Sequence, residues 1–220
     1  MQYVKTIIIK FSNTLMQNEI SAFRGAVIAS LEKDNILFHN HREDKFRYAY
    51  PLIQYKRIDG KAAIVCIGEG TEAIGEFFAS GNFWLDINGR EMVFRIADID
   101  VQRTVVECQQ MMSSYQLHDW LPLNESNYTS YLQKESLMER ICLLEKILTG
   151  NILSALKGMG IRAEDRVACT IKACSESRLV QFKRVKLMSM NATFSCNLTF
   201  PDFIGLGRHT SVGFGTIKKN

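Results

Sequence analysis

The sequence predicts an α+β fold in which two similar halves follow each other along the chain. Three observations carry this prediction. The first half alternates strand-like and helix-like segments in a βαββαβ order, the second half begins the same order again, and a glycine-rich stretch precedes the last strand. A length of 220 residues and a hydrophobic content of 46% suit one large domain or two small ones, each with a buried core.

The first half contains the more regular pattern. β-branched and aromatic residues mark its strands, apolar residues at helical spacing mark its helices, and Asp59 and Gly60 predict a hairpin turn. The βαββαβ order is that of a ferredoxin-like, or RRM-like, domain, which we place at residues 1–103. The expected strands are residues 3–11, 46–57, 61–67 and 92–101, and the expected helices are residues 18–32 and 70–80.

The second half repeats this order without its second helix. Its clearest element is a long helix with apolar residues at regular helical spacing, which a glycine pair at Gly158 and Gly160 ends. We place a second ferredoxin-like domain, with a degenerate or missing second helix, at residues 104–220. Its expected strands are residues 105–112, 167–174, 179–200 and 212–218, the third long enough to bend or break, and its expected helix is 135–156.

Composition limits the partner and the compartment. From residue 157 onward the chain carries eleven Lys or Arg against four Asp or Glu, although its overall net charge is only +4. This asymmetry predicts an acidic polymer as the partner, bound mainly by the last third of the chain. The six cysteines form no Cys-x-x-Cys pair, and no apolar run is long enough to span a membrane. We therefore expect a cytoplasmic protein with reduced thiols, no cofactor and no membrane partner.

Two of the four histidines, His39 and His41, lie close together between the first helix and the second strand. In an extended segment, residues two apart point to the same side, so this pair would face one site. Imidazole exchanges protons near neutral pH, which favours acid/base catalysis. The alternative is a polar loop whose histidines cap backbone groups. A metal site is less favoured, because the pattern offers no further ligand pair, and we assign none.

Cations and aromatic rings alternate in two strand-like segments. Such a mixture is able to stack on bases and neutralise phosphates, although alternate aromatics on a strand are also ordinary core and exposed cations are often only a solvated face. The candidate nucleic-acid-binding cations are Arg47, Lys56 and Arg57 in the first half, and Lys183 and Arg184 in the second.

The glycine-rich stretch, residues 203–217, contains four of the fourteen glycines of the chain. Glycine lets the backbone approach a ligand closely, and the polar residues between the two Gly-x-Gly pairs offer hydrogen-bond donors, so a phosphate is the natural ligand. Tight turns and bulges use the same residues, which leaves a purely structural role open. The candidate phosphate-binding residues are Gly205, Gly207, Arg208, His209, Ser211, Gly213 and Gly215.

Taken together, these features resemble those of the CRISPR-associated repeat-cleaving endoribonucleases of the RAMP superfamily. The glycine pattern from Gly205 to Gly215 resembles the signature loop of that superfamily. The segments 37–41, 47–56 and 137–148 resemble the subtype that carries a paired catalytic histidine. The resemblance covers nearly the whole chain, and the histidine pair favours an active enzyme over the related subunits that keep the loop without cutting.

The resemblance implies metal-independent cleavage of precursor CRISPR RNA within or next to a repeat. The ribose 2′-hydroxyl would attack the adjacent phosphate, giving a 2′,3′-cyclic phosphate and a 5′-hydroxyl end. His39 and His41 would then serve as acid and base, in an order that the sequence leaves open. A homodimer and a CRISPR effector complex are further expected partners. The alternatives are a non-cleaving guide-RNA-binding subunit of the same superfamily and a ferredoxin-like module that binds a small nucleotide.

Overall fold

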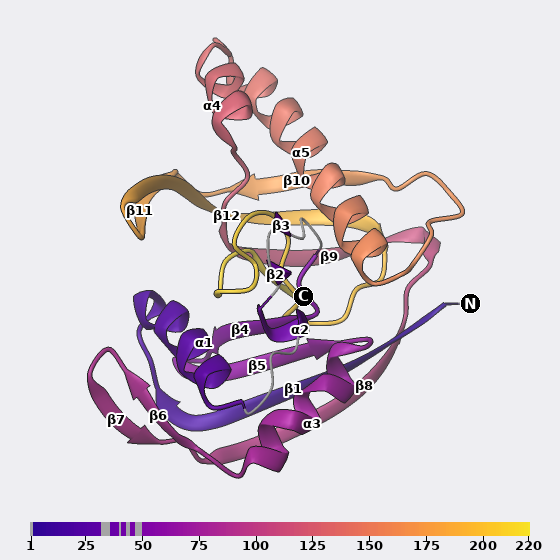
Figure 1. Ribbon diagram of the computed structural model, residues 1–220. Coiled ribbons are helices and arrows are strands. Elements are labelled where there is room, and N and C mark those ends of the chain that lie inside the picture. The colour runs from indigo at the N-terminus through magenta and orange to yellow at the C-terminus, as the bar shows by residue number, and fades with distance from the viewer. Residues whose placement is uncertain (1, 32–35, 40, 43–44, 47–49) are drawn as a thin grey trace. The chain divides into compact units, whose positions relative to one another are not determined.

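A computed structural model describes residues 2–31, 36–39, 41–42, 45–46 and 50–220 of the chain. Between residues 32 and 49, the described side chains are those of Leu37 and Phe38. The chain divides into two compact units (Figure 1). The N-terminal unit comprises residues 3–104 together with residues 211–213, and the C-terminal unit comprises residues 1–2, 105–210 and 214–220.

The N-terminal unit is built on a four-stranded sheet in the order β4-β5-β1-β8. The pairs β1–β5 and β4–β5 are antiparallel. Helices α1 and α3 cover one face of this sheet (Figure 1), and Phe23 of α1 stacks on Phe94 with ring centroids 5.0 Å apart. The main elements are β1 (Tyr3–Thr14), α1 (Ile20–Ala29), β4 (Ile53–Ile58), β5 (Lys61–Ile67), α3 (Gly70–Ser80) and β8 (Ile96–Val105).

This order confirms the predicted ferredoxin-like βαββαβ arrangement. The expected bounds of β5 and α3 agree with the structure, and α3 ends at Gly81, whose φ of 62° is left-handed. A hairpin that the sequence analysis missed, β6 (Trp84–Ile87) and β7 (Arg90–Val93), precedes β8.

The expected strand 46–57 is wrong in its first half. The strand that joins the main sheet, β4, begins only at Ile53. Pro51 has no N–H to donate to a ladder, which accounts for the later start. Before it the chain forms the short helix α2 (Ile36–His39) and two two-residue strands that pair with each other, β2 (His41–Arg42) and β3 (Lys45–Phe46).

The C-terminal unit repeats the same sheet topology. Its main strands follow the order β10-β12-β9-β13 and pair antiparallel throughout. The strand β11 pairs with the N-terminal part of β12. Two tandem ferredoxin-like domains are therefore confirmed. The strands are β9 (Cys108–Trp120), β10 (Cys169–Cys174), β11 (Arg178–Phe182), β12 (Val185–Leu198) and β13 (Thr216–Lys219).

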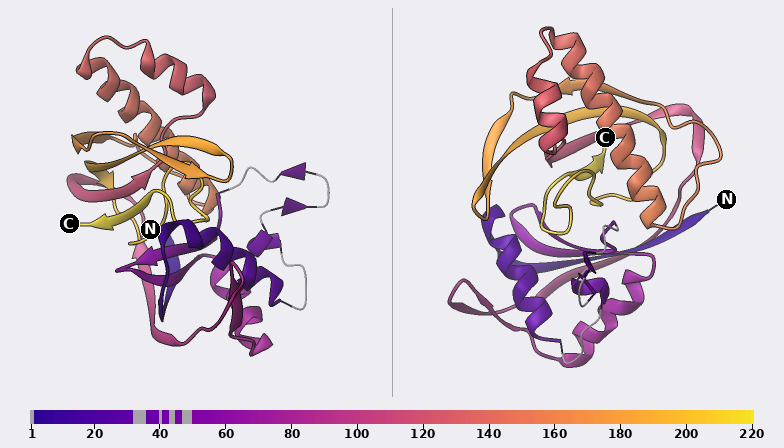
Figure 2. Two further views of the ribbon diagram at one scale, coloured as in Figure 1. Left: turned by 90° about the vertical axis from the view of Figure 1, so that its left-hand side faces the viewer. Right: turned by 45° about the horizontal axis from the view of Figure 1, so that its top comes forward.

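One long helix, α5 (Leu137–Gly158), covers this second sheet. It begins with a capping box, in which Ser136 Oγ accepts from the Glu139 N–H and the Glu139 carboxylate accepts from the Ser136 N–H. A short helix absent from the sequence expectations, α4 (Glu125–Leu132), lies beside the first turns of α5 (Figure 2). None of the helices in the described part of the chain combines the length and apolar character that a membrane crossing requires.

The predicted absence of the second helix is confirmed for the C-terminal unit. Residues 199–215, all of which the structure describes, contain neither a helix nor a named strand. The chain instead folds as an irregular loop, and Gly205 forms an isolated bridge with Thr216 at the start of β13. The glycine-rich stretch between β12 and β13 therefore replaces the helix that connects the third and fourth strands of a complete ferredoxin-like domain.

Candidate nucleic-acid interface

The histidine pair lies on two different backbone elements. His39 is the last residue of α2 and His41 the first residue of β2, so the pair does not lie on one extended segment as the sequence analysis assumed. The side chains of both histidines lie outside the described residues, and so does Arg47. Their assignment to acid/base chemistry and to phosphate binding stays a prediction.

The other two cations of the first half have different environments. Arg57 is exposed, and its Nε donates to the Leu15 carbonyl at 2.8 Å. Lys56, in contrast, is fully buried, and burial lowers its pKa to about 7. Lys56 therefore presents no surface to a phosphate, contrary to the expectation that it contacts RNA.

The glycines of the residue 203–217 stretch serve close packing of the protein chain. Gly205, Gly213 and Gly215 are buried. The Gly215 N–H donates to the Asp119 carbonyl at 3.0 Å, and the Leu206 N–H donates to the Gly215 carbonyl at 2.7 Å. The Gly215 N–H and carbonyl are therefore hydrogen-bonded within the protein. Phosphate binding by the other residues of this stretch stays a prediction.

Gly207 and Gly213 also pack so closely against neighbouring side chains that a Cβ at either position would clash. Gly207 has a φ of 98°, and a Cβ there would lie 2.8 Å from the Trp120 ring. Within the N-terminal unit, the Gly213 carbonyl accepts a hydrogen bond from Gln17 Nε2 at 3.2 Å. In the same unit, the Ser211 carbonyl accepts from the N–H of Tyr55 on β4 at 3.0 Å, so residues 211–213 follow the edge of that sheet.

The β11–β12 hairpin gathers cations around an aromatic cluster in the C-terminal unit. Its tip holds Lys183 and Arg184, both exposed, and Lys183 makes the turn with a φ of 55°. Just before the tip, the centroid of the Phe182 ring lies 4.3 Å from that of the His209 ring and 5.9 Å from that of the Phe214 ring. The tip of the hairpin is therefore anchored on the turn that holds Arg208 and His209.

We call this group the hairpin surface: Phe182, Lys183, Arg184, Arg208, His209 and Phe214. It places exposed cations beside the partly exposed rings of Phe182 and His209, which pack on the buried Phe214. Exposed cations beside rings are the combination that binds single-stranded nucleic acid by charge neutralisation and stacking. Arg208 is exposed, although one of its nitrogens, Nη1, donates to the Leu123 carbonyl at 2.9 Å. Neither phenylalanine was predicted as a site residue, although the position of Phe214 between two glycines was a usable signal.

His209 is neutral at physiological pH. Burial and then the positive charges of Arg208 and Lys183 lower its pKa to about 4. A neutral imidazole still donates one hydrogen bond and offers a flat face for stacking, but it adds no positive charge to the hairpin surface. The cations of this surface are therefore the lysine and the two arginines.

We predict that the imidazole of His209 titrates with a midpoint near pH 4 in NMR spectra of the folded protein. Because the unfolded chain binds this proton at about pH 6.5, His209 should make the C-terminal unit more stable as pH rises from 4 to 6.5. Replacing Phe182 with alanine removes part of the burial and should raise the midpoint. A midpoint near 6.5 in the unmodified protein would contradict the packing of His209 against Phe182.

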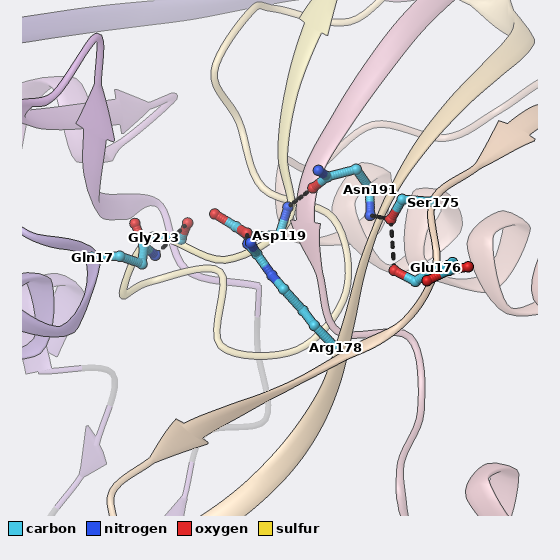
Figure 3. A network of polar contacts seen from close by, with 7 residues as sticks. All are labelled: Gln17, Asp119, Ser175, Glu176, Arg178, Asn191 and Gly213. Carbon is cyan, nitrogen blue, oxygen red and sulfur yellow. Dashed lines mark hydrogen bonds and ion pairs between the residues drawn. The ribbon is translucent and has the colours of Figure 1, made fainter.

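A network of polar contacts fixes the base of the hairpin (Figure 3). Arg178, the first residue of β11, forms an ion pair with Asp119, whose N–H donates to the Asn191 side-chain oxygen at 2.9 Å. The Asn191 N–H donates in turn to Ser175 Oγ at 3.0 Å. Asp119 has a φ of 51° and its carbonyl also accepts from Gly215, so this residue connects the hairpin to the glycine-rich stretch.

Comparison with known proteins identifies the family. The family model for the Cas6b N-terminal domain matches residues 2–105, and the model for the Cas6b C-terminal domain matches residues 107–220. Among solved structures, a crystal structure of Cas6b is similar over 100% of both chains, with a TM-score of 0.90 and 26% identity. A structure of the CRISPR RNA processing endoribonuclease Cas6b has a TM-score of 0.77 at 24% identity, again over 100% of both chains.

A curated relative, an uncharacterised protein of Methanocaldococcus jannaschii, is 36% identical over 100 residues. This match covers 44% of the present chain and 65% of the length of the relative. Because the two domain models together match almost every residue, this protein belongs to the Cas6b family.

Proposed function

We propose that this protein is a metal-independent endoribonuclease that cleaves CRISPR repeat RNA into guide RNAs. The observation that carries the proposal is the match of both Cas6b domain models along the chain. One of the similar structures is that of a CRISPR RNA processing endoribonuclease, which supports the proposal. The hairpin surface supports an RNA substrate, since it combines exposed cations with aromatic rings.

The reaction that fits this chain needs only proton transfer and charge stabilisation. A base takes the proton of the ribose 2′-hydroxyl, and the 2′-oxygen attacks the adjacent phosphorus. The bond from phosphorus to the 5′-oxygen breaks, and an acid protonates that leaving oxygen. The products are a 2′,3′-cyclic phosphate and a 5′-hydroxyl, and we assign the acid and the base to His39 and His41.

The test is cleavage of a repeat RNA by the full chain in excess EDTA. We expect one cut per repeat, unaffected by the chelator, with a cyclic phosphate on the upstream product. Replacing the scissile 2′-hydroxyl with hydrogen should stop cleavage and leave binding intact. Tight binding with intact RNA in every condition would instead favour the non-cleaving guide-RNA-binding subunit, and cutting of the 2′-deoxy substrate would overturn the proposed chemistry.

The hairpin cations should contribute directly to RNA affinity. We predict that the double variant Lys183→Ala/Arg184→Ala binds repeat RNA more weakly and with a smaller salt dependence. For two lost phosphate contacts, the slope of log K against log salt should fall by about 1.4, because each single-strand contact contributes about 0.7. Filter binding or fluorescence anisotropy at several salt concentrations measures this slope.

A charge-matched control is Lys146→Ala/Lys157→Ala, which removes two exposed cations from the surface of α5. This control should keep both the affinity and the salt slope near those of the unmodified protein. Equal effects of the two double variants would mean that only net charge matters, and the hairpin surface would then not be an RNA contact.

A further inference from the structure

Two of the six cysteines lie directly opposite each other on neighbouring strands of the C-terminal unit. Cys169, the first residue of β10, faces Cys196 of β12 in the antiparallel register. The adjacent Asn197 N–H donates to the Ala168 carbonyl at 3.1 Å, at the position of a hydrogen-bonded pair, and the Ala168 N–H donates to the Asn197 side-chain oxygen at 2.8 Å. Because such pairs alternate along a ladder, Cys169 and Cys196 form a non-hydrogen-bonded pair, in which opposite side chains lie closest.

The spacing of this kind of pair suits a covalent bond between the sulfurs. Opposite Cα atoms in non-hydrogen-bonded pairs are about 4.5 Å apart, within the range of about 4.4 to 6.8 Å that disulfides span. The two thiols are close enough to influence each other's ionisation. The interaction with the other thiol lowers the pKa of Cys196 and raises that of Cys169.

The exposure of the cysteines allows an oxidant to reach this pair and distinguishes it from other cysteines of the chain. Cys196 is fully buried, whereas Cys169 is partly exposed at the start of an edge strand. Cys142 is exposed on α5 and therefore open to oxidants. Cys66 belongs to the other unit and is buried, and burial raises its pKa well above the usual range of a thiol.

We propose that Cys169 and Cys196 are an oxidisable dithiol that closes to a cross-strand disulfide when the protein meets a peroxide. One sulfur attacks the O–O bond of hydrogen peroxide and becomes a sulfenic acid, with release of water. The other sulfur then attacks the sulfenic sulfur, the S–S bond forms, and a second water leaves with the remaining thiol proton. Two thiols are thus oxidised to one disulfide while one peroxide is reduced to two waters.

The bond would close the chain between residues 169 and 196, which contains the whole of β11 and the cationic tip of the hairpin surface. It would fix the edge strand β10 to β12 and restrict the unfolded chain, which stabilises the folded C-terminal unit. Formation of this disulfide requires only the protein and a peroxide, and no RNA. It is measured without RNA, so its failure would leave the proposed ribonuclease activity untouched, and the reverse also holds.

The experiment exposes the reduced, folded full-length protein to hydrogen peroxide, removes the peroxide, then unfolds the protein in denaturant, blocks all free thiols with N-ethylmaleimide and maps the peptides without reduction. We expect a linked pair of peptides that contain Cys169 and Cys196, and four blocked cysteines of the original six. The mass of the linked pair should be two hydrogens below the sum of the two peptides with free thiols. The Tm of the C-terminal unit should rise after oxidation, and dithiothreitol should reverse both changes.

Single variants complete the test. Cys196→Ser should abolish the linked peptides and the rise in Tm, whereas Cys142→Ser should preserve both. If Cys196→Ser does not fold, Cys169→Ser removes the more exposed partner and gives the same reading. The proposal is overturned if Cys169 and Cys196 both remain open to N-ethylmaleimide at a peroxide dose that oxidises Cys142, or if either one pairs with a different cysteine.

Discussion

Replacing His41 with alanine is expected to slow cleavage of bound repeat RNA by about 10²- to 10⁴-fold while leaving RNA affinity within a few-fold of the original. The physical reason is that 2′-hydroxyl attack needs one group to accept a proton and another to donate one, and imidazole does either near neutral pH. Single-turnover kinetics with enzyme in excess over labelled RNA measures the chemical step, and equilibrium binding of a 2′-deoxy substrate measures affinity separately.

His118 provides the matched control for this experiment. It is exposed on β9 in the C-terminal unit, so His118→Ala removes an imidazole from a surface strand and should leave the cleavage rate unchanged. The pH–rate profile then separates the roles within the pair. Loss of the acidic limb in one single variant and of the basic limb in the other would assign base and acid. If His39→Ala and His41→Ala both cleave at the original rate, the histidine mechanism is wrong.

Local patterns in the sequence were enough to predict the elements whose stability is local. The turn at Asp59 and Gly60 fixes the hairpin register of β4 and β5, and both residues adopt the positive φ that such a turn requires. The long helix α5 carries its own capping box and a regular apolar stripe, and its observed bounds lie within two residues of the expected ones. Such elements depend little on what the rest of the chain does.

Features that depend on distant contacts could not be predicted in the same way. The charge of Lys56 is visible in the sequence, but its complete burial comes from neighbours brought in by the fold. The ring contacts of His209 with Phe182 join residues on two segments that no spacing rule connects. For the same reason, the sequence revealed that the glycine-rich stretch has an unusual backbone, but it could not show that the backbone groups are used by Asp119 and Leu206 rather than by a ligand.

The packing role of the glycine-rich stretch predicts a large loss of stability for Gly215→Ala. Gly215 has a φ of 64°, which costs an L-residue roughly 1–2 kcal/mol, and an added Cβ would overlap the carbonyl oxygen of Leu206. Relieving that overlap displaces the backbone and endangers the hydrogen bonds to Asp119 and Leu206, each worth about 1 kcal/mol. We therefore expect the free energy of unfolding of the C-terminal unit to fall by about 3 kcal/mol or more.

The chain offers a clean probe and a clean control for this measurement. Its two tryptophans lie in different units, so in a Trp84→Phe background the fluorescence of buried Trp120 reports urea unfolding of the C-terminal unit alone. Gly150→Ala is the matched substitution. Gly150 lies within α5 with open space where a Cβ would go, so alanine there should stabilise by about 0.5–1 kcal/mol.

The same pair of variants tests whether the glycines of the residue 203–217 stretch are needed for packing or for phosphate binding. If packing is the reason, Gly215→Ala loses RNA affinity only in parallel with the Trp120 folding signal, and conditions that restore folding also restore binding. A folded Gly215→Ala protein with normal unfolding free energy but weakened RNA binding would instead mean that the glycine backbone contacts the RNA phosphates directly.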